Sequence, residues 1–192
     1  MTSIAIFASG TGSNARQIIR HFSGHSSIRV ALVVCNNPQA GVLSIAAESG
    51  IPALLIEKEQ FFRGDAYTPQ LRSAGIDWII LAGFLWKLPA ALVTAFPNRI
   101  INLHPALLPK YGGKGMYGKF VHEAVIAAGD QQSGISIHYV DEWYDHGSII
   151  FQASCPVTAN DTPGTLAQKI HELEYEHYPV VIEKTLQLSN QR

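Results

Sequence analysis

The N-terminal half of the chain alternates between short, continuous apolar runs and longer segments of mixed polarity. The apolar runs predict strands at 4–8, 28–34, 53–56, 77–81 and 99–103. The mixed segments between them predict helices at 14–22, 41–49, 67–74 and 89–95. Apolar runs without polar alternation are typical of strands that are covered on both faces. We therefore predict an α/β fold with a Rossmann-like, open, mostly parallel sheet flanked by helices.

The pattern changes after Pro105. Residues 111–118, YGGKGMYG, contain four glycines, and we expect a loop that is mobile without ligand. A helix is predicted at 121–128, and the runs ISIHYV and SIIFQA predict two strands around the turn DEWYDHG. We expect these strands to pair as an antiparallel addition to the sheet. A C-terminal helix is predicted over 165–188, and Pro179 is expected to kink or split it.

Composition narrows the function classes. The chain has 192 residues, which favours a single domain over 1–192, and its net charge is −1 from 14 basic and 15 acidic residues. A nucleic-acid-binding surface needs clustered Lys and Arg, so no nucleic-acid partner is expected. The apolar runs are too short to span a membrane, and no basic region precedes the first of them. We therefore expect a cytoplasmic enzyme that acts on small molecules.

The first stretch with chemical potential is SGTGSN at 9–14, directly after the first predicted strand. Its small residues and the N–H groups at the start of the following helix suit a phosphate group. It lacks the P-loop lysine and the full GxGxxG pattern, which favours a sugar phosphate over a dinucleotide or nucleoside triphosphate. The other interpretation is a tight strand-to-helix turn.

Two further stretches carry polar groups suited to acyl transfer. Asn102 and His104 lie two apart on one predicted strand and so project from the same side of it. An amide can donate to an oxyanion and an imidazole can move a proton, unless both groups only satisfy hydrogen bonds in the core. Asp145, in the turn DEWYDHG, orients His104 or, like Gly147, forms an ordinary turn. His138 is either a second polar group of the site or a satisfied strand residue.

Some histidines and lysines are candidate ligand-binding groups. His171, Glu174 and His177 partly share a helix face but lack the spacing of known zinc patterns, so we predict no metal. Lys110 and Lys114 flank the glycine-rich loop, and they either meet an acidic ligand or are simply solvated.

Taken together, the chain resembles the formyltransferases that use 10-formyltetrahydrofolate as co-substrate. Within that family it is most similar to the branch that formylates glycinamide ribonucleotide in purine synthesis. The resemblance covers nearly the whole chain, and its matching segments are SGTGSN at 9–14, LAGFLWKL at 81–88, INLHPALLPKYGG at 101–113 and SGISIHYVDEWYDHGSIIFQ at 133–152.

The resemblance implies a role for each matching residue. The implied catalytic trio is Asn102, His104 and Asp145. The implied ribonucleotide-binding residues are Gly12, Ser13, Asn14 and Glu174. The implied folate-binding residues are Arg63, Leu85, Trp86, Lys87, Leu88, Val140 and Asp141. The resemblance also implies a ribonucleotide-binding half at about 1–100 and a catalytic, folate-binding half at about 101–192 within one domain.

The chain departs from the family pattern at three places. Trp86 stands where many members have Arg, His146 stands where Gly is often found, and the loop after Gly113 lacks the His of many relatives. These departures leave the implied trio intact. They bear on the contacts to the benzoyl-glutamate part of the folate and on the loop.

Four alternatives remain open. A sugar-nucleotide N-formyltransferase can share the same trio, although SGTGSN disfavours it. A methionyl-tRNA formyltransferase is expected to carry a basic C-terminal RNA-binding domain, and a formyltetrahydrofolate hydrolase usually has an extra N-terminal domain. A non-catalytic α/β ligand-binding module would need no convergent Asn, His and Asp. The expected partners are the two small-molecule substrates, with a monomer or homodimer as the assembly.

Overall fold

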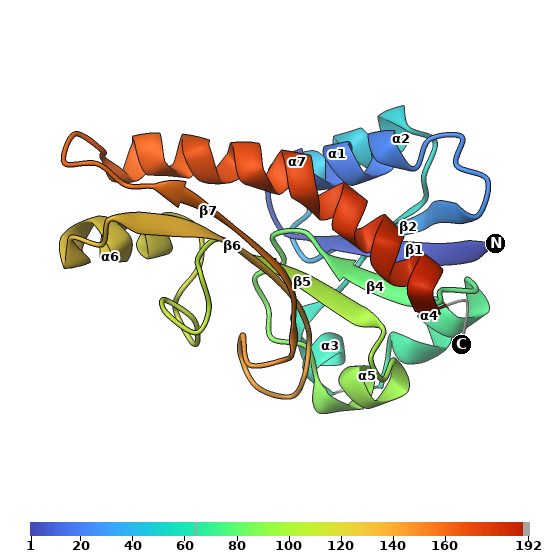
Figure 1. Ribbon diagram of the computed structural model, residues 1–192. Coiled ribbons are helices and arrows are strands. Elements are labelled where there is room, and N and C mark those ends of the chain that lie inside the picture. The colour runs from blue at the N-terminus through green and yellow to red at the C-terminus, as the bar shows by residue number, and fades with distance from the viewer. Residues whose placement is uncertain (64, 190–192) are drawn as a thin grey trace. The chain divides into compact units, whose positions relative to one another are not determined.

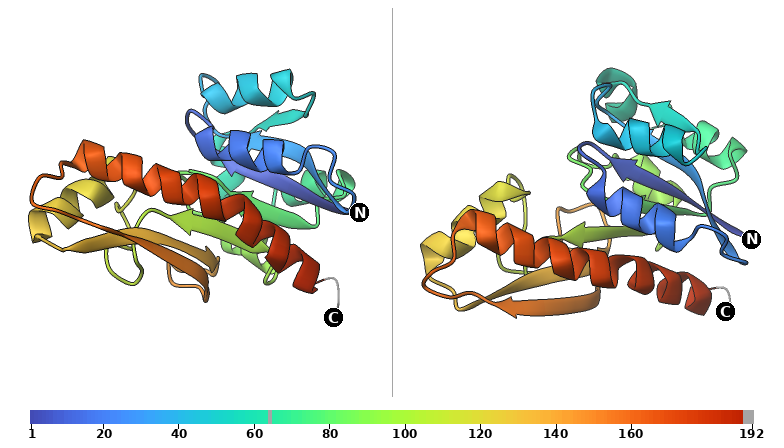
Figure 2. Two further views of the ribbon diagram at one scale, coloured as in Figure 1. Left: turned by 45° about the horizontal axis from the view of Figure 1, so that its top comes forward. Right: turned by 90° about the horizontal axis from the view of Figure 1, so that it is seen from above.

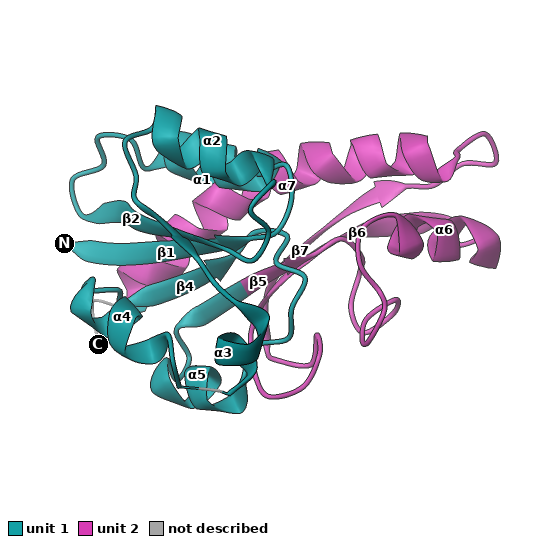
Figure 3. Cartoon of the chain, turned by 180° about the vertical axis from the view of Figure 1, so that it is seen from behind, with its two compact units in different colours: residues 1–101, 189–192 teal, residues 102–188 magenta. Residues whose placement is uncertain are grey.

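The computed structural model describes residues 1–63 and 65–189. Its contacts divide the chain into two compact units, unit 1 with Met1–Ile101 and unit 2 with Asn102–Leu188 (Figure 3). The boundary falls inside a strand, between Ile101 and Asn102.

The strands form a seven-stranded sheet in the order β3-β2-β1-β4-β5-β6-β7. In unit 1, β1 pairs in parallel with β2 and β4, and β2 pairs in parallel with β3. In unit 2, β6 and β7 are antiparallel, with Ser136 opposite Gln152. The mostly parallel fold with C-terminal antiparallel strands is therefore confirmed. The strand bounds are β1 Thr2–Ala8, β2 Ile28–Cys35, β3 Ala53–Leu55, β4 Trp78–Leu81, β5 Ile100–His104, β6 Gln132–Tyr139 and β7 Ile149–Pro156.

Helices cover both faces of the parallel strands of unit 1, with α1 and α2 on one face and α3, α4 and α5 on the other (Figures 1 and 2). In unit 2, α7 runs alongside the β6–β7 pair, and the ring contact of Phe151 on β7 with His177 on α7 agrees with this. The helix bounds are α1 Ser13–His21, α2 Gly41–Glu48, α3 Lys58–Phe62, α4 Thr68–Ser73, α5 Ala90–Ala95, α6 Lys119–Ala128 and α7 Pro163–Ser189.

Burial of apolar strands builds unit 1. Every residue of β1 is buried, as is every residue of β4. Such strands have no polar face, which is why IAIFA in β1 and WIIL in β4 are continuous apolar runs. The carboxyl ends of β1 and β4 are tied together because Ser9 Oγ accepts the Leu85 N–H at 2.9 Å and the Ser9 N–H donates to the Gly83 carbonyl at 3.1 Å.

Two helices differ from the sequence prediction. Helix α3 was not predicted, because its five residues are too few for helical periodicity to appear. Pro179 was expected to kink or split the C-terminal helix, and it does not split it, since α7 runs through it from Pro163 to Ser189. Its buried residues continue at four-residue spacing past the proline, at Ile170, Glu174, Tyr178, Ile182 and Leu186. This packing offsets the one backbone hydrogen bond that a proline removes.

Candidate active site

His104 ends β5 and is buried, with only 4% of its side chain exposed. Its Nδ1 lies 3.6 Å from Oδ2 of Asp145, which reaches it from the turn between β6 and β7. Its Nε2 lies 2.7 Å from the Tyr111 carbonyl oxygen. A carbonyl only accepts hydrogen bonds, so Nε2 carries a hydrogen and donates it. The Asp145 contact becomes an ion pair when the ring is protonated.

The β6–β7 turn holds Asp145 in an unusual backbone conformation. Its φ is 51°, in the left-handed region that Asp adopts more readily than most residues. Its Oδ2 accepts the Gly113 N–H at 2.9 Å. The Tyr139 N–H donates to the Ser148 carbonyl at 2.9 Å and closes the turn, where a Cβ on Gly147 would collide with the Tyr139 carbonyl. Gly147 is therefore required for the close approach that aims Asp145 at the histidine.

His138 on β6 completes the group. Its Nδ1 lies 2.8 Å from the Tyr139 carbonyl oxygen, which fixes the hydrogen on Nδ1 and leaves Nε2 as an acceptor in the neutral ring. Nε2 lies 3.1 Å from Nδ2 of Asn102 and 3.7 Å from Oδ1 of Asp145. Burial lowers the pKa of His138, and this outweighs the Tyr139 carbonyl and Asp145, which both raise the pKa.

The neutral His138 fixes the amide of Asn102. One N–H of that amide donates to Nε2 of His138, so the amide orientation is set and the second N–H stays available as a donor. Both ring nitrogens of His138 have partners, as expected of a satisfied strand residue, and one of those partners, Asn102, belongs to the predicted trio. The predicted trio is thus brought together within unit 2, and His138 lies between Asn102 and Asp145.

A buried hydroxyl holds the segment that follows His104. Ser136 Oγ donates to the Ala106 carbonyl at 2.7 Å and accepts the Leu108 N–H at 2.9 Å. Gln152, opposite on β7, donates from Nε2 to Ser136 Oγ at 2.8 Å and to the Leu108 carbonyl at 3.1 Å. These bonds pair backbone groups that would otherwise be buried unsatisfied, and they fix the chain that leads from His104 into the glycine-rich loop.

The SGTGSN stretch forms the turn from β1 to α1 in unit 1. Gly12 precedes α1 with φ 80°, and no side chain caps this end of the helix. A Cβ on Gly12 would lie 2.8 Å from Ile45 Cδ1 and 2.9 Å from the Val42 Cα, so α2 packs directly against the turn. The N–H groups at the start of α1, beside Ser13 and Asn14, therefore form a donor set suited to an anion.

The predicted folate segment 85–88 joins an aromatic cluster in unit 1. Trp86 packs on Phe61 and Phe62 of α3, with ring centroids 5.6 Å apart in each case. This accounts for the tryptophan at an arginine position, since its partners are aromatic rings of a helix that the sequence pattern did not predict. Leu85 is exposed and Leu88 is buried. Arg63, at the end of α3, is exposed and lies 3.9 Å from Glu59.

The other predicted residues lie apart from the trio's hydrogen bonds. Glu174 is buried on α7, where its charge contributes to a raised pKa of Tyr178 after the larger effect of burial. Asp141 accepts the Trp143 N–H at 2.8 Å and pairs with Nδ1 of His146 at 2.9 Å, which braces the turn next to Val140. His146, which stands where glycine is often found in the family, thus pairs with Asp141.

Sequence reasoning missed the backbone contributions of Tyr111 and Gly113. These contacts use main-chain carbonyl and N–H groups, which no side-chain motif reveals. A signal for His138 was present, because Ser136 and His138 alternate with the apolar Ile135 and Ile137 in the predicted strand.

Two further features are absent from the residues that the structure describes. Among residues 1–63 and 65–189, no three His, Cys, Asp or Glu side chains are grouped so that they could hold a metal ion. Within the same ranges, no helix has the length and apolar character needed to cross a membrane.

Residues 2–182 match the formyl transferase family. A chloroplastic phosphoribosylglycinamide formyltransferase of Arabidopsis thaliana is 43% identical over 185 residues, which cover 93% of this chain and 63% of the relative. The chain therefore spans under two thirds of that plant protein. The phosphoribosylglycinamide formyltransferase of Bacillus subtilis is 36% identical over 195 residues, covering 99% of this chain and 97% of the relative.

Solved structures agree with the sequence matches. A phosphoribosylglycinamide formyltransferase from Bacillus halodurans superposes with a TM-score of 0.87 at 35% identity, covering 96% of this chain and 95% of that one. A glycinamide ribonucleotide transformylase from Geobacillus kaustophilus superposes with a TM-score of 0.88 at 33% identity, covering 97% and 99%.

Proposed function

The chain belongs to the formyl transferase family, and we propose that it transfers the formyl group of 10-formyltetrahydrofolate to the amine of glycinamide ribonucleotide in purine synthesis. The observation that carries this proposal is the convergence of Asn102, His104 and Asp145 in a family member. The near full-length relative from Bacillus subtilis, whose name states this activity, supports the choice of acceptor.

The proposed reaction is a direct acyl transfer. The ribonucleotide amine attacks the formyl carbon, and the carbonyl oxygen becomes an oxyanion in a tetrahedral intermediate. The free N–H of Asn102 donates to this oxyanion, and its direction is set in advance by His138. Protonated His104, paired with Asp145, adds a compensating positive charge.

Collapse of the intermediate requires a proton to move from the attacking amine to the leaving folate nitrogen. His104 is suited to this step because an imidazole both takes and gives a proton near neutral pH. Asp145 pairs with the ring in its protonated state, and the Tyr111 carbonyl accepts from Nε2 in both states. The mechanism uses no metal and no covalent enzyme intermediate. Holding both substrates side by side would supply much of the rate.

Substrate binding is assigned to further residues. Gly12, Ser13 and Asn14 would hold the ribonucleotide phosphate and ribose through the donor set at the start of α1. Glu174 would meet the amine end of the same substrate. The folate would contact Arg63, Leu85, Trp86, Lys87, Leu88, Val140 and Asp141. Units 1 and 2 would act as one formyltransferase domain, in the cytoplasm, as a monomer or homodimer.

One absorbance assay separates this function from its alternatives. We would follow consumption of 10-formyltetrahydrofolate, or of a 10-formyl folate analogue, with and without glycinamide ribonucleotide. The proposal expects turnover only with the ribonucleotide present. Turnover without it would favour a hydrolase, turnover with an amino sugar nucleotide alone would favour the sugar-nucleotide enzyme, and no turnover would favour a binding module.

A further inference from the structure

The second contact of His104 leads away from the site and into the glycine-rich loop. Its Nε2–H donates to the Tyr111 carbonyl at 2.7 Å, the shortest hydrogen bond that His104 makes among the described residues. Tyr111 has φ 55°, in the left-handed region that a tyrosine rarely adopts. Such a conformation persists only where surrounding contacts hold it. The side chain of Tyr111 makes such a contact.

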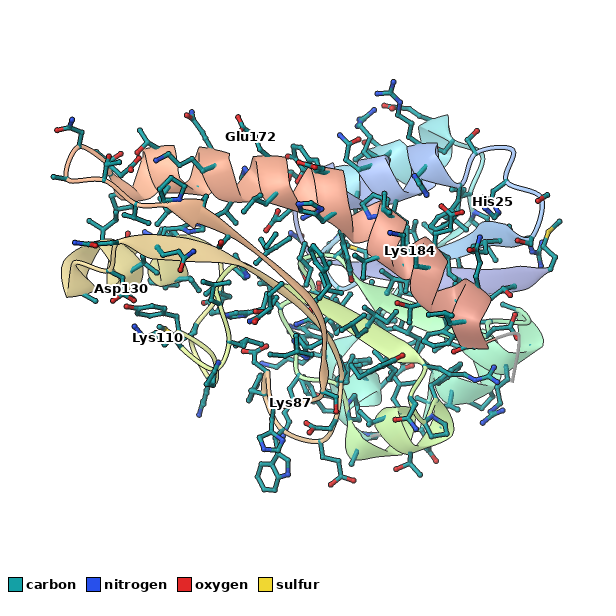
Figure 4. All side chains as sticks on the ribbon, viewed as in Figure 1. His25, Lys87, Lys110, Asp130, Glu172 and Lys184 are labelled. Atoms are coloured by element: carbon teal, nitrogen blue, oxygen red, sulfur yellow. The ribbon has the colours of Figure 1, made fainter. Side chains whose placement is uncertain are left out.

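The tyrosine side chain is anchored at the far end of α6. Tyr111 Oη donates to Oδ2 of Asp130 at 2.9 Å. The same carboxylate pairs with Nζ of Lys110, at 2.9 Å from Oδ2 and 3.3 Å from Oδ1. Figure 4 shows Lys110 and Asp130 next to each other below α6. The hydrogen bonds from Lys110 and Tyr111 lower the pKa of Asp130, so the carboxylate stays ionised as an acceptor.

We propose that Asp130 is a positioning residue for the formyl transfer, and that it acts on His104 through Tyr111. The Asp130–Tyr111 hydrogen bond holds the tyrosine in place, and the Tyr111 carbonyl then holds Nε2 of His104. With that nitrogen occupied, the ring presents Nδ1 to Asp145. It follows that Nδ1 is the nitrogen of His104 that exchanges a proton during the reaction.

An effect of Asp130 on the reaction rate can be separated from an effect on the stability of the fold. The Lys110 side chain is 68% exposed and that of Asp130 is 25% exposed. Hydrogen-bonded ion pairs this close to the surface contribute little to stability. Tyr111→Phe removes only the hydroxyl and keeps both the ring and the carbonyl that meets His104. Loss of activity in this variant would therefore come from orientation and not from a missing partner of the histidine.

The test compares Tyr111→Phe, Asp130→Ala, which removes both acceptor oxygens, and the double variant with the wild type. Because small displacements of a catalytic group are costly, we expect each single variant to lower kcat about tenfold, with the KM of both substrates unchanged within about twofold. The double variant is expected to be no slower than either single variant, since both changes break one connection. Glu123→Gln, on the exposed surface of α6, is the matched control and is expected to behave as the wild type.

A second measurement reports on His104 directly. Nitrogen NMR of the ring is expected to show Nε2 protonated and hydrogen-bonded in the wild type and in Glu123→Gln. In Tyr111→Phe and Asp130→Ala, the Nε2 resonance is expected to shift as the carbonyl contact weakens. An unchanged resonance, an unchanged kcat, or a loss of kcat that only follows a fall in the folded fraction would overturn the proposal.

This inference rests on the proposed function, but the two fail differently. If the wild type transfers no formyl group, the proposed function fails, and the NMR comparison still decides whether Asp130 positions His104. If the wild type is active and the variants equal it, only the positioning role fails.

Discussion

Units 1 and 2 use their buried positions for different purposes. In unit 1 the buried strands β1 and β4 are almost wholly apolar. In unit 2, β6 buries Ser133, Ser136 and His138 among its apolar residues. Within the described part of the chain, the buried histidines and the buried glutamate all lie in unit 2. Burying such groups has a desolvation cost unless hydrogen bonds offset it. The buried strands of unit 1 thus serve mainly packing, and unit 2 holds the buried histidines and glutamate.

The largest effect that this comparison predicts concerns His104 in unit 2. His104→Ala removes the proposed proton carrier and the charge beside the oxyanion, and it is expected to lower kcat by about a thousandfold. The variant should still fold, with a lower thermal midpoint because the Tyr111 carbonyl loses its donor, and the KM of both substrates should change little; a melting curve and steady-state kinetics would show this. His171→Ala, at an exposed position of α7, is the control. Near-normal kcat in His104→Ala would place the chemistry elsewhere.

The second prediction addresses binding in unit 1. Ser13→Asp places a carboxylate in the first turn of α1, where it suits the helix dipole but repels a phosphate. We expect the KM for the ribonucleotide to rise about tenfold or more while kcat is unchanged and the fold remains stable. Ser13→Ala keeps the site neutral and should change KM far less. Equal KM values for the two variants would show that the phosphate does not bind at this turn.

The hydrophobic pattern predicted unit 1 well for a physical reason. Its strands are buried on both faces, so their sequences alone carry the signal, as in IAIFA and DWIIL. In unit 2 the pattern located the strands, and the motif located Asn102, His104 and Asp145. The pattern could not show that the Tyr111 carbonyl and the Gly113 N–H complete the site, since these are backbone groups. Nor could it show that Phe61 and Phe62 support Trp86, because α3 is too short to show a helical period.

A matched pair of serines on β6 provides the third prediction. Ser136→Ala removes the acceptor of the Leu108 N–H and should lower the free energy of unfolding by about 1–3 kcal/mol. Ser133 is buried on the same strand, and its hydroxyl makes no hydrogen bond in the described structure. Ser133→Ala should therefore be neutral or slightly stabilising. Denaturant unfolding of both variants measures the difference, and equal losses would contradict the role given to Ser136.

The smallest effect predicted is a dependence of stability on pH. Burial is the largest cause of the lowered pKa of His122 and of His138, both from an ordinary value of 6.5. The unfolded chain then binds more protons than the folded chain, so the free energy of unfolding falls as the pH drops through about 6.5 toward the folded pKa values. His122→Gln should flatten this dependence in denaturant unfolding at several pH values. If the free energy of unfolding depends on pH in the same way in His122→Gln as in the wild type, His122 binds protons equally in the folded and the unfolded chain.

The most direct test of the account follows the formyl carbon itself. The enzyme would be incubated with glycinamide ribonucleotide and 10-formyltetrahydrofolate carrying carbon-13 in the formyl group, and the products followed by carbon NMR. We expect the label to appear as the formamide carbon of the ribonucleotide in the wild type and this signal to be almost lost in His104→Ala. Label released as formate, or a signal that His104→Ala leaves intact, would contradict this expectation.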